Sequence, residues 1–600
     1  MRRFRGKHTD PALSGVGWAR VSLRLLAIGL LLIATGCPRA ATPPRPEPVA
    51  KAPPPPPAAP APDAGSPTPE SSELDLPPSP SDPFAAMYSK RLDFKGGDPV
   101  VPVRLMEGAT EVTFIPRGRM RMRVSGPIEK TLEAPAYSAW TVRLTQGEPA
   151  QIGYRIQLGE FRLADKAGLA AEQKAWEERG FKVRVHTLGS VYGIAGKVID
   201  NRRYLLLMEE VLSPEKTQEA QARLLREYGA RTSLFEELEK KPTGILEVLD
   251  AGKASVALGQ NRIVAELLDG VGIGVKHVEY GVGYPFHGFQ DRAYRGALEL
   301  TVDRNGKLAV VNLIPLEELL KGLVPSEIFA NAPMEALKAQ AVTARGEVLA
   351  KIGLKHLADP YLLCAEQHCA VYRGLSGETG ATNVAVDGTR GLALFSQDGH
   401  LVDSVYSAVC GGHTEDNDVV WGGPPDPNLR GKPDILPGNP ILASPDNLAA
   451  FLATPQAAAC RLSNFAVPGK FRWEKRFTAE QLDALTAPLH LGKVQAITVD
   501  ERGVSGRARL LTLSGDAGAT QIRGELNIRR LFGMLNSAMF LVTPLRGPNG
   551  APTGWLFQGG GWGHGVGMCQ TGAAGRAQAG QRYPEILRHY FNGAEVAPIY

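Results

Sequence analysis

The chain has 600 residues, of which 22% are charged, and a formal net charge of +5. This length exceeds what a single hydrophobic core organises, so several domains are expected. Residues 1–36 contain six Lys/Arg and one Asp, and this segment alone therefore carries the net +5. The remainder is close to neutral and has no basic stripe, which excludes a nucleic-acid-binding protein.

The N-terminal segment has the features of an export signal. Basic residues precede an apolar run from Leu25 to Ile33, which is too short to span a bilayer. The segment ends in Ala34-Thr35-Gly36-Cys37, which resembles a bacterial lipobox, where cleavage leaves a lipidated cysteine. We expect residues 1–37 to be a lipoprotein signal peptide and Cys37 to be the membrane anchor. The alternative is ordinary signal cleavage with an incidental Cys37.

Residues 38–97 form a linker rich in proline and alanine. A stretch such as "KAPPPPPAAPAPDAGSPTPE" cannot bury a core and favours extended polyproline II. A lipid anchor followed by a long, stiff tether fits a protein that works at a distance from its membrane. We therefore expect a location in the cell envelope, as a membrane-anchored lipoprotein facing the periplasm.

Two small units are expected next. Residues 98–149 form a small β region, because "EVTFIP" and "RMRMRVSG" alternate apolar and polar residues. In residues 150–243 the order strand, helix, strand occurs twice, which predicts a small α/β domain. The stretch from "YRIQLGEF" to "GFKVRV" resembles a SPOR domain, a module that binds peptidoglycan strands lacking stem peptides. A structural α/β domain without a ligand is the alternative.

Residues 244–600 are expected to form one mixed α+β unit. The pair Asn305-Gly306 between alternating runs predicts a β-hairpin. The stretch "LEELLKGL" predicts a short helix that ends before Pro325. A second helix is expected to begin with Asn331 as its cap and Pro333 in its first turn. The whole chain is thus predicted to be a multidomain α+β protein with a β-rich N-terminal region and a small α/β middle domain.

One carboxylate stands out in the stretch "LVPSEIFANAPMEALKAQAVTARGEV", residues 323–348. Glu327 is predicted to lie between two helices, next to Pro325 and the apolar pair Ile328-Phe329. Apolar surroundings raise the pKa of a carboxyl group, as a general acid requires. A capping residue in a short turn is the alternative that this stretch alone leaves open.

Four sequence blocks resemble the stage II sporulation protein D (SpoIID/LytB) family, which includes peptidoglycan lytic transglycosylases and amidase enhancers. They are "VPSEIFANAP", "EALKAQAVTAR", "DSVYSAVCGGHTEDNDVVWGG" and "GWGHGVGMCQTGAAG", in that order across about 300 residues. The resemblance implies that Glu327 is the catalytic acid. Four positions depart from the family pattern, namely Ile328, Gly346, Cys410 and Cys569, and they put the details of substrate fit in doubt.

The same resemblance, with the chemistry of the side chains, implies a set of glycan-binding residues. Aromatic faces stack on sugar rings, and amide, imidazole, hydroxyl and guanidinium groups bind hydroxyls or orient a carboxylate. The residues expected in this role are Gln340, Arg345, Tyr406, Ser407, Trp421, His564 and Gln570. For each aromatic residue a place in the core is the alternative, for Arg345 a solvated surface position, and for His564 a structural role in a glycine-rich turn.

A cluster of four metal-binding side chains follows the second block. His356, Cys364, His368 and Cys369 lie within fourteen residues, and two thiolates with two imidazoles suit tetrahedral zinc. Some members of the family bind zinc through a similar cluster. Four protein ligands would close the site, so the zinc would be structural. A Cys364–Cys369 disulfide is the alternative, and Cys410 with Cys460 is a second disulfide hypothesis.

These observations lead to one main functional prediction. The protein is expected to be a lytic transglycosylase that cleaves MurNAc–GlcNAc bonds in peptidoglycan, with Glu327 as general acid and base and 1,6-anhydroMurNAc ends as product. A hydrolase needs a second carboxylate, and Glu415, Asp416 and Asp418 are available in the third block. A non-catalytic enhancer that binds glycan and stimulates a cell-wall amidase is the main alternative. A zinc hydrolase would need an open metal position, which four protein ligands do not leave.

Overall fold

A computed structural model describes residues 82–600 except 283–285, 367–368, 437–440 and 455. The described residues all belong to one compact unit, Pro77–Tyr600. The predicted signal peptide, Cys37, most of the linker and His368 lie outside the described residues. Within the described part of the chain, no helix is both long and apolar enough to cross a membrane.

The first large sheet has eight strands and is antiparallel apart from one short edge pairing. Its order is β1-β2-β19-β18-β15-β4-β5, and β20 pairs in parallel with β2. The predicted Asn305-Gly306 hairpin is confirmed, because it joins β18 to β19. The strands are β1 (Asp93–Lys95), β2 (Asp98–Ala109), β4 (Met120–Val124), β5 (Lys130–Ala134), β15 (Arg262–Leu267), β18 (Ala297–Val302), β19 (Leu308–Pro315) and β20 (Leu363–Cys364).

The second large sheet has six strands in the order β14-β13-β6-β3-β16-β17. These are β3 (Glu111–Pro116), β6 (Trp140–Glu148), β13 (Thr243–Leu249), β14 (Ser255–Gln260), β16 (Ile273–Tyr280) and β17 (Gly288–Tyr294).

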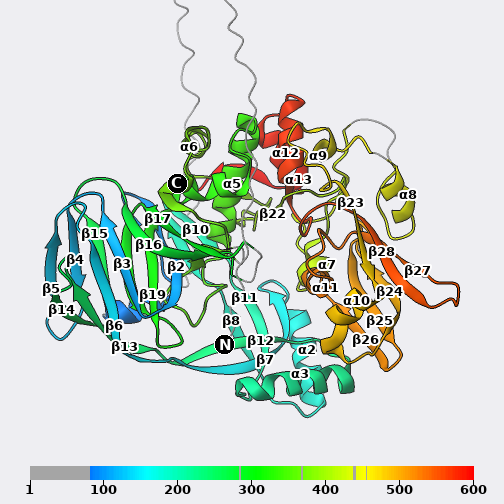
Figure 1. Cartoon of the computed structure of the whole chain (residues 1–600), viewed down its shortest axis with the longest axis horizontal. Helices are drawn as coiled ribbons and strands as arrows, with labels where there is room; N and C mark the ends of the chain where they lie inside the picture. The colour runs from blue at the N-terminus through cyan, green and yellow to red at the C-terminus, as the bar shows by residue number, and fades with distance from the viewer. Residues whose placement is uncertain (1–81, 283–285, 367–368, 437–440, 455) are drawn as a thin grey trace, which may run out of the picture. The chain divides into compact units, whose positions relative to one another are not determined.

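The predicted boundary between residues 98–149 and 244–315 does not exist, since both sheets contain strands from both segments (Figure 1). The physical reason is one shared core, in which Phe114 and Val142 pack with Leu246 and Leu300.

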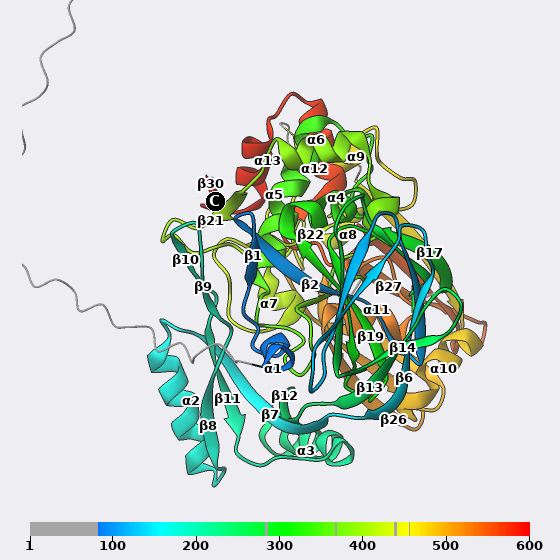
Figure 2. The same ribbon diagram turned by 90° about the vertical axis from the view of Figure 1, so that its left-hand side faces the viewer.

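The middle domain is inserted between strands β6 and β13. Its elements are β7 (Gln151–Arg162), α2 (Lys166–Glu178), β8 (Val183–Leu188), β11 (Arg203–Met208), α3 (Pro214–Tyr228) and β12 (Ser233–Lys240). The sheet order β12-β7-β11-β8 and the repeated strand–helix–strand succession are those of a split βαβ domain (Figure 2). Both helices cover one face, where Trp176 and Leu224 pack with Ile156 and Leu206. The predicted α/β fold is therefore confirmed, and the SPOR resemblance stays a prediction.

A hairpin within this domain supports the C-terminal unit. It consists of β9 (Val191–Ile194) and β10 (Lys197–Asp200). The Tyr192 hydroxyl donates to the carbonyl of Leu349 at 2.6 Å. The side chain of Asn201 donates to the carbonyls of Ala350 and Ile352 at 3.0 and 2.8 Å. These three bonds satisfy carbonyl groups at the end of helix α5.

Helices α4 (Leu316–Glu327) and α5 (Met334–Ala350) form the centre of the C-terminal unit. Helix α5 is buried on nearly all sides, because its small residues let α4, α6, α12 and α13 pack closely (Figures 1 and 2). Two predicted boundaries are wrong. Helix α4 continues through Pro325, since the N–H of Ile328 still reaches the carbonyl of Val324 at 3.2 Å. Helix α5 begins after Pro333, not after Asn331.

Several short elements complete this part of the fold. The helices are α1 (Pro83–Met87), α6 (Gly380–Asp387), α7 (Asn417–Trp421), α8 (Leu448–Ala453), α9 (Ala459–Leu462), α12 (Gln570–Gln578) and α13 (Tyr583–Tyr590). Two-stranded pairs join β21 (Leu392–Phe395) to β30 (Glu595–Pro598) and β22 (Tyr406–Ser407) to β29 (Met568–Cys569). The second pair joins the third sequence block to the fourth.

A separate hydrophobic core lies between the third and fourth blocks and was not predicted from the sequence. Trp473, Leu511, Phe532, Phe557 and Trp555 are among its buried residues. One sheet has the order β23-β28-β27 and the other β24-β25-β26. The elements are β23 (Arg472–Thr478), α10 (Ala479–Thr486), β24 (Val494–Arg502), β25 (Ala508–Gly515), β26 (Gly518–Arg523), α11 (Glu525–Leu531), β27 (Phe540–Arg546) and β28 (Pro552–Gly560).

Candidate active site

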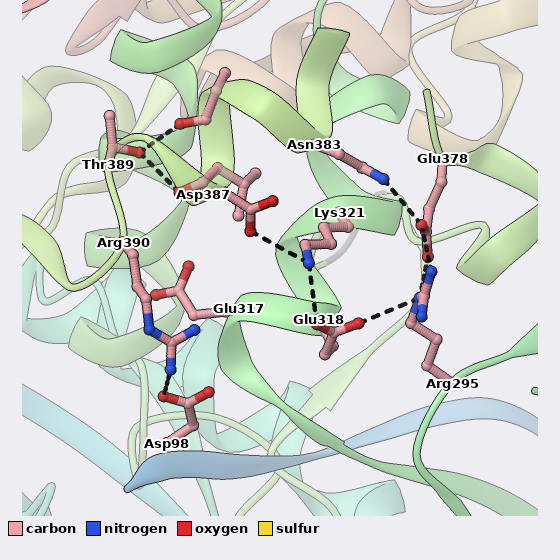
Figure 3. Close-up of polar contacts among 12 residues, drawn as sticks. Asp98, Arg295, Glu317, Glu318, Lys321, Glu378, Asn383, Asp387, Thr389 and Arg390 are labelled. Atoms are coloured by element: carbon pink, nitrogen blue, oxygen red, sulfur yellow. Dashed lines mark hydrogen bonds and ion pairs between the residues drawn. The ribbon is translucent and has the colours of Figure 1, made fainter. Parts of the chain in front are cut away.

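Ion pairs fix the first turns of helix α4, which carries Glu327 at its end. Figure 3 shows Lys321 between Glu318 at 3.1 Å and Asp387 at 3.2 Å. It also shows Arg295 between Glu318 at 3.2 Å and Glu378 at 2.6 Å. These contacts connect α4 to Arg295, just before β18, and to the segment that contains α6. A carboxylate at the end of such a helix has a fixed position.

Glu327 was predicted to lie in a turn between two helices. It is instead the last residue of α4, because this helix continues about one turn further than predicted. Its Oε1 accepts a hydrogen bond from the N–H of Val371 at 3.0 Å. The residue as a whole is half-buried, while its carboxyl group is surrounded by protein. The neighbouring Phe329 is exposed, and its ring lies 5.7 Å from that of Phe465. The carboxyl group therefore lies at the inner side of an apolar surface.

Burial raises the pKa of Glu327 from 4.5 to about 7. The hydrogen bond from Val371 and the charge of Lys351 act in the opposite direction, and the charge of Glu347 adds to the increase. Removal of water from around a carboxylate disfavours its charged form, which is the dominant effect here. A carboxyl group with a pKa near neutrality can both donate and accept a proton at physiological pH.

The raised pKa predicts a pH-dependent stability difference between the wild type and Glu327→Gln. Below pH 4.5 the carboxyl is protonated in both the folded and the unfolded chain, so burial has no electrostatic cost. As the pH rises from 4.5 to about 7, the unfolded chain loses this proton while the folded chain keeps it, so wild-type stability falls. Above pH 7 the carboxyl is ionised in both states and the loss is complete. At pH 8 we expect Glu327→Gln to be more stable by at most about 3 kcal/mol. Denaturant unfolding at pH 4 and pH 8 measures this; a difference of the same size at both values would contradict the account.

The amide groups of Gln570 and Gln340 hold the backbone at Glu327. Gln570 Nε2 donates to the carbonyl oxygen of Glu327 at 3.0 Å and to Oε1 of Gln340 at 3.3 Å. Both glutamines are buried. Gln340 Nε2 and Ser407 Oγ are buried polar atoms that lack a hydrogen-bond partner among the described residues. This geometry gives both glutamines a positioning role behind the acid rather than direct access to a sugar.

Tyr406 and Ser407 join the fourth block through the parallel pairing of β22 with β29. Burial raises the pKa of Tyr406 well above its usual range, and the charges of Glu327 and Glu347 act in the same direction. Tyr406 also forms a hydrogen bond with Glu347. The tyrosine therefore lies close to both carboxylates and stays protonated, so it can donate a hydrogen bond.

His564 is not available to sugar hydroxyls, contrary to the prediction. Its Nε2–H donates to the carbonyl of Tyr406 at 2.9 Å, and its Nδ1 accepts from the N–H of Val566 at 3.1 Å. Burial lowers the pKa of His564 to about 3, which keeps the ring neutral. Both nitrogens are therefore used within the protein. The role of the histidine is to fix the glycine-rich fourth block against Tyr406.

Trp421 lies over this histidine. The two ring centroids are 5.0 Å apart, and Trp421 is 55% exposed at the end of α7. Trp562 is also exposed, and Lys470 lies 4.7 Å from its ring centroid. An exposed aromatic face supported from behind is the kind of surface on which a pyranose ring stacks.

Arg345 does not contact Glu327. Its guanidinium forms two bonds with the carboxylate of Glu317, at 2.8 and 2.7 Å, and neither side chain is more than 1% exposed. Glu317 also accepts from the N–H of Gly391 at 3.2 Å and from the Tyr600 hydroxyl. Arg345 was expected to bind hydroxyls or to orient a carboxylate, and the carboxylate that it orients is that of Glu317, not that of Glu327. The arginine instead joins α5 to α4 and to the end of the chain.

The comparisons with known proteins agree with this arrangement. Residues 304–395, which contain Glu327 and all of α5, match the stage II sporulation protein (SpoIID) family. This segment of the chain is therefore similar to the SpoIID family. Residues 415–567, which contain the second hydrophobic core, match a domain of unknown function, DUF8618.

Individual relatives match about half of the chain. An uncharacterised protein of Brachyspira hyodysenteriae is 29% identical over 315 residues, which are 52% of this chain and 74% of the relative. The amidase enhancer of Bacillus subtilis is 28% identical over 46% of this chain but only 39% of its own length. Stage II sporulation protein D of Bacillus amyloliquefaciens is 26% identical over 50% of this chain and 79% of its own length.

The carboxylates of the third block are engaged in other contacts. Glu415 is fully buried and accepts from the Ser505 hydroxyl at 2.6 Å. Asp416 and Asp418 pair with Arg430 at 3.4 and 2.6 Å. All three therefore already have partners within the protein. The carboxylate that interacts with Glu327 is Glu347.

Glu347, Lys351 and Val371 are site residues that the sequence analysis missed. Glu347 pairs with Lys351 one turn further along α5, and both groups influence the pKa of Glu327. The spacing of Glu347 and Lys351 is visible in the sequence, but a surface i,i+4 pair has the same pattern. Val371 contributes only its backbone N–H, so no side-chain pattern could identify it.

Three of the predicted metal ligands lie together. His356, Cys364 and Cys369 place a ring nitrogen and two sulfurs within 4.8 Å of one another. His356 Nε2 is 3.1 Å from the Cys369 sulfur, while its Nδ1 contacts Asp359 at 3.0 Å. An imidazole with a carboxylate on its second nitrogen is the usual arrangement of a metal-bound histidine. These three residues have the donor atoms of a zinc site. The sulfurs of Cys364 and Cys369 are 2.7 Å apart, closer than two zinc-bound sulfurs, and the predicted fourth ligand, His368, lies outside the described residues.

Proposed function

We propose that this protein cleaves glycan strands of peptidoglycan between MurNAc and GlcNAc by lytic transglycosylation. The observation that carries the proposal is the environment of Glu327, a carboxyl with a pKa of about 7 at the end of a fixed helix. The exposed Trp421 belongs to the same assembly through His564 and Tyr406. One proton donor next to an aromatic surface is what this reaction needs.

In this reaction one carboxyl group acts twice. Protonated Glu327 gives its proton to the glycosidic oxygen while the bond from that oxygen to C1 of MurNAc breaks. The resulting carboxylate accepts the proton of the C6 hydroxyl of the same sugar, whose oxygen then bonds to C1. The products are a 1,6-anhydroMurNAc end and a free hydroxyl on GlcNAc, and no water is consumed. Tyr406 and Gln570 would position the acid and are not consumed.

The exposed tryptophan provides a testable part of the substrate site. Trp421→Ala is expected to weaken binding of stem-peptide-free glycan strands about 3- to 10-fold, since a lost aromatic stack costs roughly 0.5–1.5 kcal/mol. Stability should change little, because the ring is 55% exposed. Co-sedimentation with insoluble glycan measures the affinity. Phe289→Ala, on β17, is the control for loss of an exposed ring; equal losses in both variants would contradict the role of Trp421.

A structural zinc at His356, Cys364, His368 and Cys369 would support the acid. The last ligand lies two residues before Val371, whose N–H binds Glu327. Zinc would supply a cross-link that fixes this loop, and Val371 would then hold the carboxyl of Glu327 in place. We include this zinc and the membrane anchor at Cys37 in the proposal, with the middle domain as a further glycan-binding unit in the cell envelope.

A second function is favoured by one comparison. The similarity to an amidase enhancer supports a protein that binds glycan and stimulates a separate cell-wall amidase. In that case Glu327 would help to bind the strand without cleaving it. The two functions differ in their products.

Product analysis distinguishes them. Purified protein is incubated with intact and with stem-peptide-free peptidoglycan, and the soluble fraction is examined by mass spectrometry. Anhydro-muramoyl ends support the proposed function, and reducing ends indicate hydrolysis. Absence of soluble glycan from both substrates, together with faster peptide release when a cell-wall amidase is added, would support the enhancer and overturn the transglycosylase.

A further inference from the structure

Three cysteines that the proposed function does not use lie together in the main hydrophobic core. Cys410, Cys460 and Cys569 are each at most 1% exposed, and Asp434 beside them is fully buried. One ligand atom from each of these four residues lies within 4.8 Å of the others. The residues come from four separate segments of the chain, so their convergence is a property of the fold.

The distances fit tetrahedral coordination. The sulfurs of Cys410 and Cys460 are 3.7 Å apart, and the sulfur of Cys410 is 3.3 Å from Oδ2 of Asp434. Zinc–sulfur bonds of about 2.3 Å at tetrahedral angles place two sulfurs roughly 3.8 Å apart, and a sulfur and an oxygen roughly 3.5 Å apart. One ion of that size can therefore contact these ligands with small side-chain shifts.

The surroundings of Cys569 favour a thiolate. The Cys569 sulfur accepts from the N–H groups of Cys410 at 3.1 Å and Gly572 at 3.3 Å, at the start of helix α12. Backbone donors at a helix N-terminus stabilise negative charge. Two buried polar donors directed at one sulfur are unnecessary for a cysteine that serves only as a small apolar residue.

Buried cations balance the charge of such a site. Three thiolates and Asp434 carry four negative charges, of which a divalent ion neutralises two. Arg576 binds Asp434 Oδ1 at 2.9 Å, Arg507 donates to the carbonyl of Cys410 at 2.9 Å, and Arg472 donates to the carbonyl of Gly411 at 2.8 Å. These guanidinium groups supply the positive charge that balances the remainder.

The carboxylate is oriented as metal ligands usually are. The hydroxyl of Tyr590 donates to Oδ2 of Asp434 at 2.9 Å, and Arg576 holds the other oxygen. Contacts of this kind from outside the ligand set fix a carboxylate for coordination. Two glycines keep the space open: a Cβ on Gly572 would lie 2.3 Å from Oδ2 of Asp434, and one on Gly575 would lie 2.1 Å from the carbonyl of Ala459.

We propose that Cys410, Asp434, Cys460 and Cys569 bind a second structural zinc ion, distinct from the one at His356, Cys364, His368 and Cys369. Three soft sulfur ligands and one oxygen in a closed, buried site suit zinc. The ion joins the third sequence block to the fourth, because Cys410 follows β22 and Cys569 ends β29. It therefore stabilises the assembly that carries Tyr406 and His564. A Cys410–Cys460 disulfide, the earlier hypothesis, would use two of the four groups and leave the donors to Cys569 unexplained.

Metal analysis of the full-length protein, prepared without chelators and reductants, tests the proposal. Elemental mass spectrometry should find one zinc equivalent fewer in Cys460→Ser than in the wild type. Cys364→Ser is the matched control, which should retain the zinc at Cys460. In a cobalt-substituted Cys364→Ser protein, thiolate-to-cobalt charge-transfer absorption should persist and should disappear when Cys460→Ser is added. An unchanged zinc content in Cys460→Ser would overturn the proposal.

A measurement on the wild type covers the case in which Cys460→Ser fails to fold. Untreated protein is unfolded in an alkylating reagent, and its peptides are identified without reduction. Alkylation of Cys410, Cys460 and Cys569 together with the bound zinc supports the site. A cross-linked peptide containing Cys410 and Cys460 would overturn it and establish the disulfide instead.

Discussion

Glu327→Gln is expected to reduce release of soluble glycan by at least about 100-fold, which is the usual contribution of general acid–base catalysis. The change removes the transferable proton and little else. Glutamine has the same shape and can accept the hydrogen bond from Val371 through its amide oxygen. The rate is measured as anhydro-muramoyl ends formed per minute from stem-peptide-free strands, with circular dichroism to confirm the fold.

Glu111→Gln is the control for this variant. Glu111 lies on β3, outside helix α4, and its exposed carboxylate pairs with Arg143 at 3.2 Å. We expect its activity to stay within about twofold of the wild type, because paired surface carboxylates contribute at most about 1 kcal/mol. If Glu327→Gln retained more than a tenth of the wild-type rate, Glu327 would not be the acid.

Arg345→Met is expected to lower the free energy of unfolding by about 3–5 kcal/mol, the cost of removing one partner of a buried ion pair. Glu317 would then be left buried without its guanidinium partner. In the folded wild type the ion pair with Arg345 outweighs burial and keeps the pKa of Glu317 below its usual value. The loss should therefore be present at neutral pH and diminish as the pH falls and Glu317 becomes protonated.

Chemical denaturation measures this loss at pH 7 and pH 4. Glu317→Gln/Arg345→Met should recover part of the stability, since the neutral amide can still accept from Gly391. Arg123→Met is the control for an exposed ion pair, that with Glu266 at 2.9 Å, and should cost less than about 1 kcal/mol. If Arg345→Met also lowered the free energy of unfolding by less than about 1 kcal/mol, the result would contradict a structural role for the buried pair.

Local patterns predicted much of the fold. The Asn305-Gly306 hairpin, the alanine-rich buried helix and the doubled strand–helix–strand order of the middle domain all depend on neighbouring residues, and all are present. The shared sheets of residues 98–149 and 244–315 could not be predicted in this way. They depend on pairing between strands separated by more than a hundred residues, which leaves no mark in a local window.

The candidate site was likewise predicted only in part. The sequence pattern identified Glu327, Tyr406 and Trp421, whose side chains are proposed to carry the chemistry. The partners of Arg345 and His564 could not be predicted, because an arginine or histidine in a motif has the same letter whether it faces a ligand or the protein. The carbonyls of Leu392 and Tyr406 accept hydrogen bonds from Arg345 and His564, and backbone atoms have no sequence signature.

The most direct test of the central claim is a reaction in water enriched in oxygen-18. Stem-peptide-free glycan strands are incubated with the wild-type protein, and the new MurNAc ends are weighed by mass spectrometry. Because Glu327 is proposed to transfer the proton from the C6 hydroxyl without using water, the ends should be 1,6-anhydro and contain no oxygen-18. Reducing ends labelled with oxygen-18 would show that water attacks C1 and would contradict the account.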